Sequence, residues 1–342
     1  MKKKITKRTR RKRSVIRNTI LLMFLLTIAL LAGIYGILML RETKGLDASY
    51  AYERIVKPVD LTMDADMQRA KPFAADLCVI NGNRNMDEIN LTGSNEKATL
   101  LNLDDRQVMY AHNIHDRTYP ASITKIMTAI LAIKYGNMND NVTISRNAVT
   151  LEAGSQLCGF QAGDIVTMDE LFHGLLVYSG NDAAMAIAEH IGGSVDNFMK
   201  MMNEELRAIG ATNTHFVNPH GLHDDEHFTT AYDIYLMLNE ALKYEYFVDV
   251  MQLGVYNLSY RRADETITVK LDSTDRYLTG ETAAPMGVTV LGGKTGTTSL
   301  AGACLAILSQ NEYGKPYVSI VLGAPTKAIL YQDMNQLLAQ IN

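Results

Sequence analysis

A serine and a lysine three residues apart stand at the start of a regular apolar segment. In Ser122-Ile123-Thr124-Lys125, the i, i+3 spacing places the two functional side chains on one face of a helix. The apolar residues of this segment recur at helical spacing: Ile123, Ile126, Met127, Ile130 and Leu131. A serine becomes a nucleophile when a base takes its proton, and a lysine can serve when burial and a neighbouring cation lower its pKa. We therefore predict covalent catalysis with Ser122 as the nucleophile and Lys125 as its base.

The same spacing occurs a second time, at Ser94 and Lys97. That pair lies in a polar Gly93-Ser94-Asn95 turn with no apolar helix behind it. At Ser122, by contrast, the free N–H groups of a helix start would stabilise negative charge beside the serine. We therefore assign the nucleophile to Ser122 and not to Ser94.

A second polar group, Ser179-Gly180-Asn181, falls in a tight turn between two predicted helices. Taken alone, it has an ordinary structural explanation, because Asn181 and Asp182 are residue types that cap the following helix. Its interest comes from its position in the chain, after Ser122 and before a third group.

The third group, Lys294-Thr295-Gly296-Thr297, lies on a predicted strand. An ammonium, hydroxyl groups and glycines that leave the backbone open suit a substrate carboxylate laid along that strand. The alternative is a glycine-rich bend with a solvated lysine. A phosphate-binding loop is excluded, because the spacing is not GxxxxGK[ST] and no helix follows.

The order of the elements around these groups predicts an α+β fold. Strands are expected at residues 76–80, 98–102, 108–112, 288–298, 302–309 and 316–324. Helices are expected at residues 123–135, 171–177, 183–191, 194–209, 230–244 and 330–341, with Thr167 and Glu170 as a capping box. Strands at both ends predict an antiparallel sheet that is closed by the two halves of the chain and flanked by helices, with an inserted helical lobe.

The N-terminal region predicts a membrane anchor. Residues 20–40 are uncharged and apolar, and as a helix they would span about 32 Å, close to the roughly 30 Å of a hydrocarbon core. Ten basic residues and no acid precede this segment, so residues 1–19 are expected to be a cytoplasmic tail. Residues 41–70 then form a linker, and residues 71–342 a catalytic domain outside the cell membrane. Cleavage near Ala51 would instead release a soluble form.

Charge and composition exclude other classes of protein. The 342 residues are 47% hydrophobic with 7 prolines, which excludes a disordered or collagen-like chain. The net charge is −4, and all 37 acidic residues follow residue 40, so the body of the protein is acidic. Nucleic-acid binding needs a basic face and is not expected.

Cysteine and histidine residues suggest no metal or cofactor. Three cysteines (Cys78, Cys158 and Cys304) match no zinc or CxxC spacing, and we expect buried or free thiols. His220, His223 and His227 with nearby acids resemble a ligand cluster, but they lack a helical i, i+4 pair or an HExxH pattern.

The three groups in this order, together with their flanking residues, resemble the serine D-alanyl-D-alanine carboxypeptidases, which are low-molecular-mass penicillin-binding proteins. The resemblance covers roughly residues 74–342 and rests on four stretches. These are Pro120-Ala121-Ser122-Ile123-Thr124-Lys125-Ile126-Met127-Thr128, Ser179-Gly180-Asn181-Asp182-Ala183, Asn218-Pro219-His220-Gly221-Leu222 and Lys294-Thr295-Gly296-Thr297-Thr298. It implies a β-lactamase/transpeptidase-like fold and a penicillin-binding D,D-carboxypeptidase domain at residues 71–342, without metal or cofactor.

The resemblance also implies a role for each residue. Ser122 would attack the peptide bond between the two D-alanines of a peptidoglycan stem pentapeptide, with Lys125 as base and Ser179 as proton relay. Asn181 would hold the substrate amide and Lys125. The terminal carboxylate would be taken by Lys294 and Thr295, and the oxyanion would be bound by the N–H groups of Ser122 and Thr297. β-Lactam antibiotics would acylate the same serine.

Three alternatives share this scaffold. A class A-like β-lactamase would need a deacylating glutamate in an E-x-x-L-N stretch, which the sequence lacks after Asn181. A D,D-endopeptidase acting on crosslinks, or a non-enzymatic sensor of β-lactams or cell wall, would retain the same residues. Residues 253–287 depart from the family pattern, so the loop that borders the third group, Lys294-Thr295-Gly296-Thr297, is not predicted.

Overall fold

The computed structural model describes residues 76–342, all of which belong to one compact unit, Asp60–Asn342. The predicted tail, the apolar segment at residues 20–40 and the linker at residues 41–70 lie outside the described residues. Within residues 76–342, no helix is long and apolar enough to cross a bilayer.

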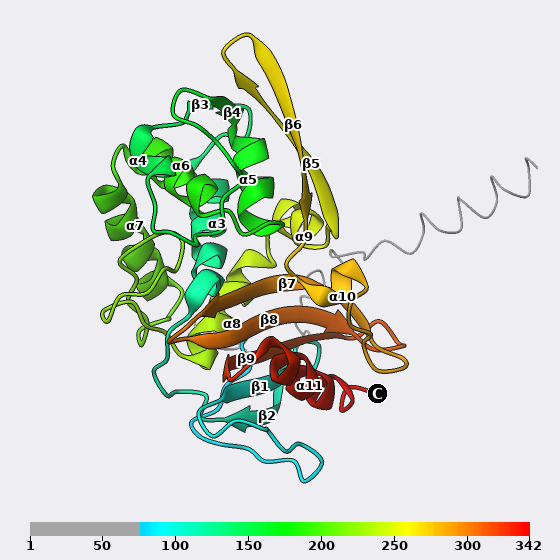
Figure 1. Cartoon of the computed structure of the whole chain (residues 1–342). Coiled ribbons are helices and arrows are strands. Elements are labelled where there is room, and N and C mark those ends of the chain that lie inside the picture. Colours follow the sequence, from blue (N-terminus) through cyan, green and yellow to red (C-terminus); the bar gives the residue numbers. More distant parts are fainter. Residues whose placement is uncertain (1–75) are drawn as a thin grey trace, which may run out of the picture. The chain divides into compact units, whose positions relative to one another are not determined.

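A five-stranded antiparallel sheet forms one half of the described unit (Figure 1). Its strands, in spatial order, are β2 (Gln107–His112), β1 (Lys97–Asn102), β9 (Pro316–Ala324), β8 (Gly302–Gln310) and β7 (Thr289–Thr298). The early strand β1 pairs with the late strand β9, from Lys97 opposite Leu322 to Asn102 opposite Tyr317. The two halves of the chain therefore close the sheet, as predicted, and β7 is left as an edge strand.

One face of this sheet is covered by α11 (Lys327–Leu338), visible across the strands in Figure 1. Leu330 and Met334 of this helix pack on Leu100, Leu305 and Val321, all of them buried. The other face contacts α8 (Ala231–Ala241) and the short 3-10 helix η1 (Ala121–Thr124). Because η1 also contacts β7, the predicted nucleophile is carried to the edge of the sheet.

The helical lobe surrounds α3 (Lys125–Tyr135), which continues η1 and packs against four other helices. Its helices are α4 (Arg146–Val149), α5 (Met168–Leu176), α6 (Asn181–Gly192), α7 (Val195–Ala208) and α9 (Glu245–Met251), whereas the short α10 (Arg276–Thr279) contacts β7 of the main sheet. Ile126 and Ile130 of α3 are fully buried. The predicted capping box of α5 is confirmed in its N-cap half, because Thr167 Oγ1 accepts from the Glu170 N–H. The reciprocal half was wrong, since the Glu170 carboxylate accepts from the N–H of Ser259 and not from that of Thr167.

A second antiparallel sheet was not predicted. It consists of β3 (Asn141–Thr143), β4 (Ile165–Thr167), β5 (Val255–Arg262) and β6 (Glu265–Asp272), in that order. Strands β5 and β6 form a long hairpin that extends along the helical lobe (Figure 1).

Three further predictions of elements were wrong. Residues 76–80 form no strand. The segment 230–244 is broken, with α8 ending at Ala241 and α9 beginning at Glu245. The last helix starts at Lys327, because Thr326 Oγ1 caps it by accepting from the Ile329 N–H.

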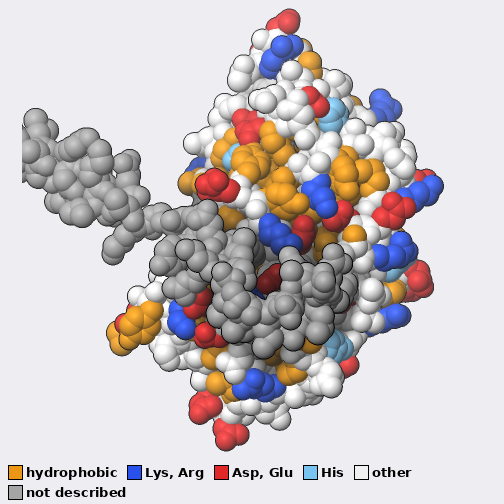
Figure 2. Space-filling view, turned by 180° about the vertical axis from the view of Figure 1, so that it is seen from behind, with side chains coloured by type: hydrophobic (Ala, Val, Ile, Leu, Met, Phe, Trp, Pro, Cys, Tyr) orange, Lys and Arg blue, Asp and Glu red, His pale blue; other side chains and the backbone are white. Residues whose placement is uncertain are grey.

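Charged side chains of both signs are interspersed on the face opposite to that of Figure 1 (Figure 2). Ion pairs on the surface of the described residues include Lys243 with Glu240 and Lys270 with Asp272. Such a mixed surface is typical of a solvated protein domain.

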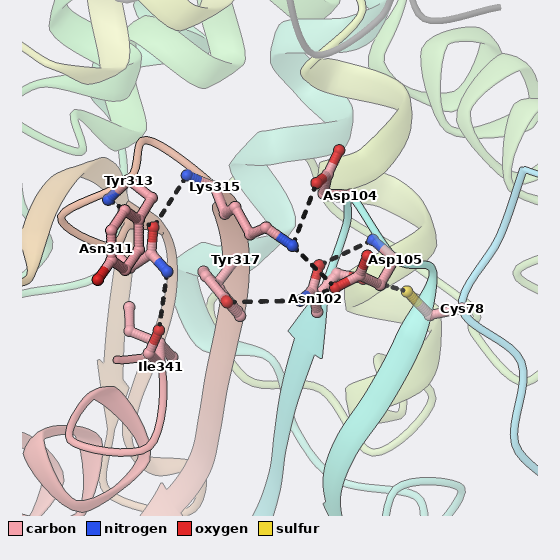
Figure 3. A network of polar contacts seen from close by, with 9 residues as sticks. All are labelled: Cys78, Asn102, Asp104, Asp105, Asn311, Tyr313, Lys315, Tyr317 and Ile341. Atoms are coloured by element: carbon pink, nitrogen blue, oxygen red, sulfur yellow. Dashed lines mark hydrogen bonds and ion pairs between the residues drawn. The ribbon is translucent and has the colours of Figure 1, made fainter. Parts of the chain in front are cut away.

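A polar network joins the β1–β2 turn, the β8–β9 turn and the C-terminus (Figure 3). The Asn102 amide donates to Asp105, and Lys315 pairs with the same carboxylate. On the other side, Asn311 Nδ2 donates to the Ile341 carbonyl. This network fixes the end of the sheet remote from the β7–β8 turn.

The three predicted thiols are free and buried, as expected. Cys78 Sγ contacts the Asn102 carbonyl at the edge of this network (Figure 3).

Candidate active site

The Lys125 ammonium lies at the centre of the predicted site. Its Nζ is 3.0 Å from Ser122 Oγ, 2.7 Å from Asn181 Oδ1 and 2.8 Å from the His220 carbonyl oxygen. Once deprotonated, the amine can keep its two hydrogens on Asn181 and His220 while its lone pair faces the Ser122 hydroxyl. The geometry thus suits a base for Ser122.

Burial is the main cause of a pKa of Lys125 well below the ordinary value for lysine, and the positive charge of Lys294 lowers it further. The Lys125 side chain is fully buried, and Asp182 opposes the shift only in part. The neutral amine that a general base requires is therefore favoured by the site.

Lys294 of β7 is also buried, and its Nζ donates to Ser179 Oγ at 2.8 Å and to the Thr295 carbonyl at 2.9 Å. Desolvation lowers the pKa of Lys294 to about 7, although the nearby Asp275 carboxylate raises it. The Lys294 ammonium is thus directed at Ser179, the predicted proton relay. Because Lys294 is buried, it would act on a substrate carboxylate from beneath the surface of β7.

The turn that carries Ser179 and Asn181 is tightly held. Ser179 has a φ of 66°, which is rare for a residue with a side chain, and Asn181 is the first residue of α6. A Cβ atom at Gly180 would lie 2.3 Å from Cys158 Sγ, so the close approach of residue 158 requires glycine there. Asp182 Oδ1 and Oδ2 accept from the N–H groups of residues 158, 159 and 160 and so bind this segment to the turn.

On β7, the Thr295 hydroxyl lies 2.5 Å from that of Thr274, a residue of the connection between β6 and α10. Thr297 is exposed two residues further along the strand. A Cβ atom at Gly296 would lie 2.9 Å from Ser122 N, so glycine allows the nucleophile's backbone to approach the strand. The structure therefore brings all three sequence groups together.

The sequence also contains two alternative sets of residues, the Ser94–Lys97 pair and the histidines that resemble metal ligands. Lys97 Nζ donates to the backbone and side-chain oxygens of Asn95, and Ser94 is not among its partners. His220 and His227 are buried, and desolvation lowers the pKa of each to about 3, so both rings are neutral. Among residues 76–342, no group of three His, Cys, Asp or Glu side chains is arranged to hold a metal ion.

Four contributors were not predicted from the sequence: Thr274, Asp275, the carbonyl of His220 and the ring of His227. Thr274 and Asp275 fall in the region that departed from the family pattern. The His220 carbonyl is a backbone group, which no residue type marks.

Residues 86–326 match the model of the family Peptidase_S11, described as D-alanyl-D-alanine carboxypeptidase. The chain belongs to this family. It is 36% identical over 236 residues to D-alanyl-D-alanine carboxypeptidase DacF of Bacillus subtilis, covering 68% of this chain and 58% of that protein. It is 31% identical over 248 residues to DacC of Escherichia coli, covering 70% and 59%. The chain thus spans less than two thirds of the length of these relatives.

Solved structures of similar proteins share the fold. A mutant of the Streptomyces K15 DD-transpeptidase superposes with a TM-score of 0.66 at 25% identity, covering 71% of this chain and 95% of that one. D-alanyl-D-alanine carboxypeptidase DacD of Francisella tularensis gives a TM-score of 0.62 at 27% identity, covering 77% and 72%. The expected α+β fold with antiparallel sheets and helices is confirmed, and the comparisons do not favour the β-lactamase or sensor alternatives.

Proposed function

We propose that the protein is a serine-type D-Ala-D-Ala carboxypeptidase that removes the terminal D-alanine from peptidoglycan stem pentapeptides. The observation that carries this proposal is the position of Lys125 Nζ, 3.0 Å from Ser122 Oγ in a fully buried setting that favours the neutral amine. Membership of the family supports the substrate class.

In the acylation step, Ser122 Oγ attacks the carbonyl carbon of the peptide bond between the two D-alanines, and the hydroxyl proton passes to Lys125 Nζ. The negative charge on the carbonyl oxygen is stabilised by the N–H groups of Ser122 and Thr297. The C–N bond then breaks, and the proton that Lys125 took up passes through the Ser179 hydroxyl, which lies 2.8 Å from Lys294 Nζ, to the leaving amine. Water hydrolyses the resulting ester and regenerates Ser122.

The substrate's terminal carboxylate is taken along β7. The Thr295 hydroxyl donates to it, and the Lys294 ammonium, 2.9 Å from the Thr295 carbonyl, adds a positive potential from below. Asn181, whose Oδ1 accepts from Lys125, has an amide NH₂ left for the substrate. β-Lactams enter the same site and acylate Ser122.

The test is release of D-alanine from a synthetic stem pentapeptide by the purified full-length chain. Wild type and Ser94→Ala should release it, and Ser122→Ala should not. Ser94→Ala is the matched control, because Ser94 has the same sequence spacing to a lysine. Turnover by Ser122→Ala, or none by wild type, would contradict the proposal.

The proposed location is the cell membrane, with residues 20–40 as a single-pass anchor and residues 71–342 outside. The uncharged apolar run and the ten basic residues within the first 17 support it. External protease on protoplasts should digest the catalytic domain. Protection of that domain, while an external marker is cut, would contradict the topology, and a soluble form beginning near Ala51 would indicate cleavage.

A further inference from the structure

The residue before the nucleophile has an unusual backbone. Ala121 has a φ of 48°, in the left-handed region that alanine rarely adopts. Its carbonyl and the N–H of Ser122 belong to one planar peptide unit, so the direction of either group fixes that of the other. In the proposed function, on which this inference rests, the Ser122 N–H binds the oxyanion, so whatever fixes the Ala121 carbonyl also directs an oxyanion donor.

Backbone packs on both sides of this peptide unit. A Cβ atom at Gly221 would lie 1.9 Å from the Ala121 oxygen, and one at Gly296 would lie 2.9 Å from Ser122 N. The two glycines leave space for the unit. This close packing provides no hydrogen bond that would fix the direction of the Ala121 carbonyl.

The directed bond comes from Thr124, whose buried Oγ1 donates to the Ala121 carbonyl oxygen at 2.9 Å. Thr124 Oγ1 is also 2.8 Å from Nε2 of His227, which lies 103 residues further along the chain. Because the only hydroxyl hydrogen is directed at Ala121, His227 must be the donor in this contact.

The surroundings of His227 select that tautomer. Its Nδ1 accepts from the Val217 N–H at 3.1 Å, which leaves the ring hydrogen on Nε2. The ring is stacked on Phe216 with centroids 4.6 Å apart and is almost completely buried. The chain of donors therefore runs in one direction, from His227 to Thr124 to the Ala121 carbonyl.

We propose that Thr124 and His227 are positioning residues of the reaction, which hold the Ala121–Ser122 peptide so that the Ser122 N–H is directed at the oxyanion. Neither side chain touches the substrate in this proposal. Their effect is exerted through the peptide unit alone.

The test compares Thr124→Val, which keeps the shape but loses the hydroxyl, with Thr124→Ser, which keeps the hydroxyl. Acylation of the full-length chain by a penicillin is followed by stopped flow, and the ester carbonyl stretch of the acyl-enzyme by infrared difference spectroscopy. Loss of a whole oxyanion donor slows reactions about 10²- to 10³-fold, so a misdirected one in Thr124→Val should slow acylation about 10- to 100-fold. The ester band should move to higher wavenumber, and Thr124→Ser should match wild type in both readouts.

His227→Phe keeps the ring stacked on Phe216 but cannot donate, and the ester band should shift in the same direction as in Thr124→Val. A merely structural role would lower the amount of folded protein and its melting temperature, yet leave the rate per folded molecule and the ester band unchanged. That result would overturn the inference. If Thr124→Val does not fold, Thr124→Ala against Thr124→Ser decides by the same two readouts. Failure of wild type to form any acyl-enzyme would contradict the proposed function instead.

Discussion

Replacing Gly180 by alanine would test how closely the turn between Ser179 and Asn181 is packed. The backbone there (φ −60°, ψ 125°) is open to any residue, so the effect comes from the added methyl group. That methyl would lie 2.3 Å from Cys158 Sγ and 2.9 Å from Asp182 Oδ1. Since non-bonded atoms prefer about 3.5–4.0 Å, the turn or residue 158 must move by roughly 1 Å.

Overpacking of this kind costs about 1–3 kcal/mol in the free energy of unfolding. In a domain of this size, each kcal/mol lowers the melting temperature by roughly 2–4 °C, so Gly180→Ala should lose roughly 2–12 °C. Acylation should fall more steeply, by about 100-fold, because a 1 Å displacement of catalytic groups has that effect. Ser179 Oγ and Asn181 Oδ1, on either side of Gly180, accept from Lys294 and Lys125.

The assay is a double-mutant cycle with Cys158→Ala, measured by thermal unfolding and by penicillin acylation. Removing the sulfur makes room for the methyl, so the double variant should recover part of both losses, with a coupling of about 1–2 kcal/mol. Recovery is partial because the Asp182 contact remains. Gly82→Ala is the control, since a Cβ atom there meets nothing within 4 Å. Effects that simply add would refute the argument that Cys158 limits this turn.

Three further predictions concern charge. Acylation should rise with pH through an apparent pKa well below the roughly 10.4 of free lysine, because Lys125 must be neutral to act as the base. Lys125→Arg should be nearly inert in the same assay, because a guanidinium stays protonated. Substantial activity of that variant would indicate another base. Glu96 is buried beside Asp333, and its pKa is raised from 4.5 to about 7, mainly by desolvation, so the fold favours the protonated carboxyl. The resulting stability is complete below about pH 4.5 and is lost as the pH rises through about 7; Glu96→Gln should flatten this change in melting temperature, and an unaltered profile would contradict it. Thr295→Val, or a substrate with an amidated terminal D-alanine, should slow acylation by the substrate about 10- to 100-fold. The two changes together should slow acylation by less than the product of the two separate factors, because both remove the same contact. Equal rates for acid and amide would favour an endopeptidase.

The main sheet could be predicted because β1, β8 and β9 are apolar runs bounded by turn residues, which local pattern reveals. Strand β5 alternates between exposed and buried positions only in part, and β3 and β4 have three residues each, so their pattern is too short or too weak to indicate a sheet. Residues 76–80 have a strand-like composition, but tertiary contacts decide: the Cys78 N–H donates to the Tyr235 hydroxyl and not to a neighbouring strand.

The candidate site was predictable where its residues are close in sequence. Ser122 and Lys125 are three residues apart, and the groups at Ser179 and Lys294 have recognisable spacing of their own. Thr274 meets Thr295 across 21 residues, and His227 meets Thr124 across 103. Such contacts depend on how the strands and loops pack, and no local pattern reports them. The histidines that resembled metal ligands show this most clearly, because His227 binds a hydroxyl and a backbone N–H instead.

The most direct test of the central claim, that Lys125 activates Ser122, is the site of the covalent adduct. The full-length chain is incubated with a penicillin, digested and examined by mass spectrometry. The account predicts a penicilloyl mass on the peptide that contains Ser122, and no adduct in Ser122→Ala or Lys125→Arg. An adduct on the peptide that contains Ser94, or undiminished labelling of Ser122→Ala, would contradict it.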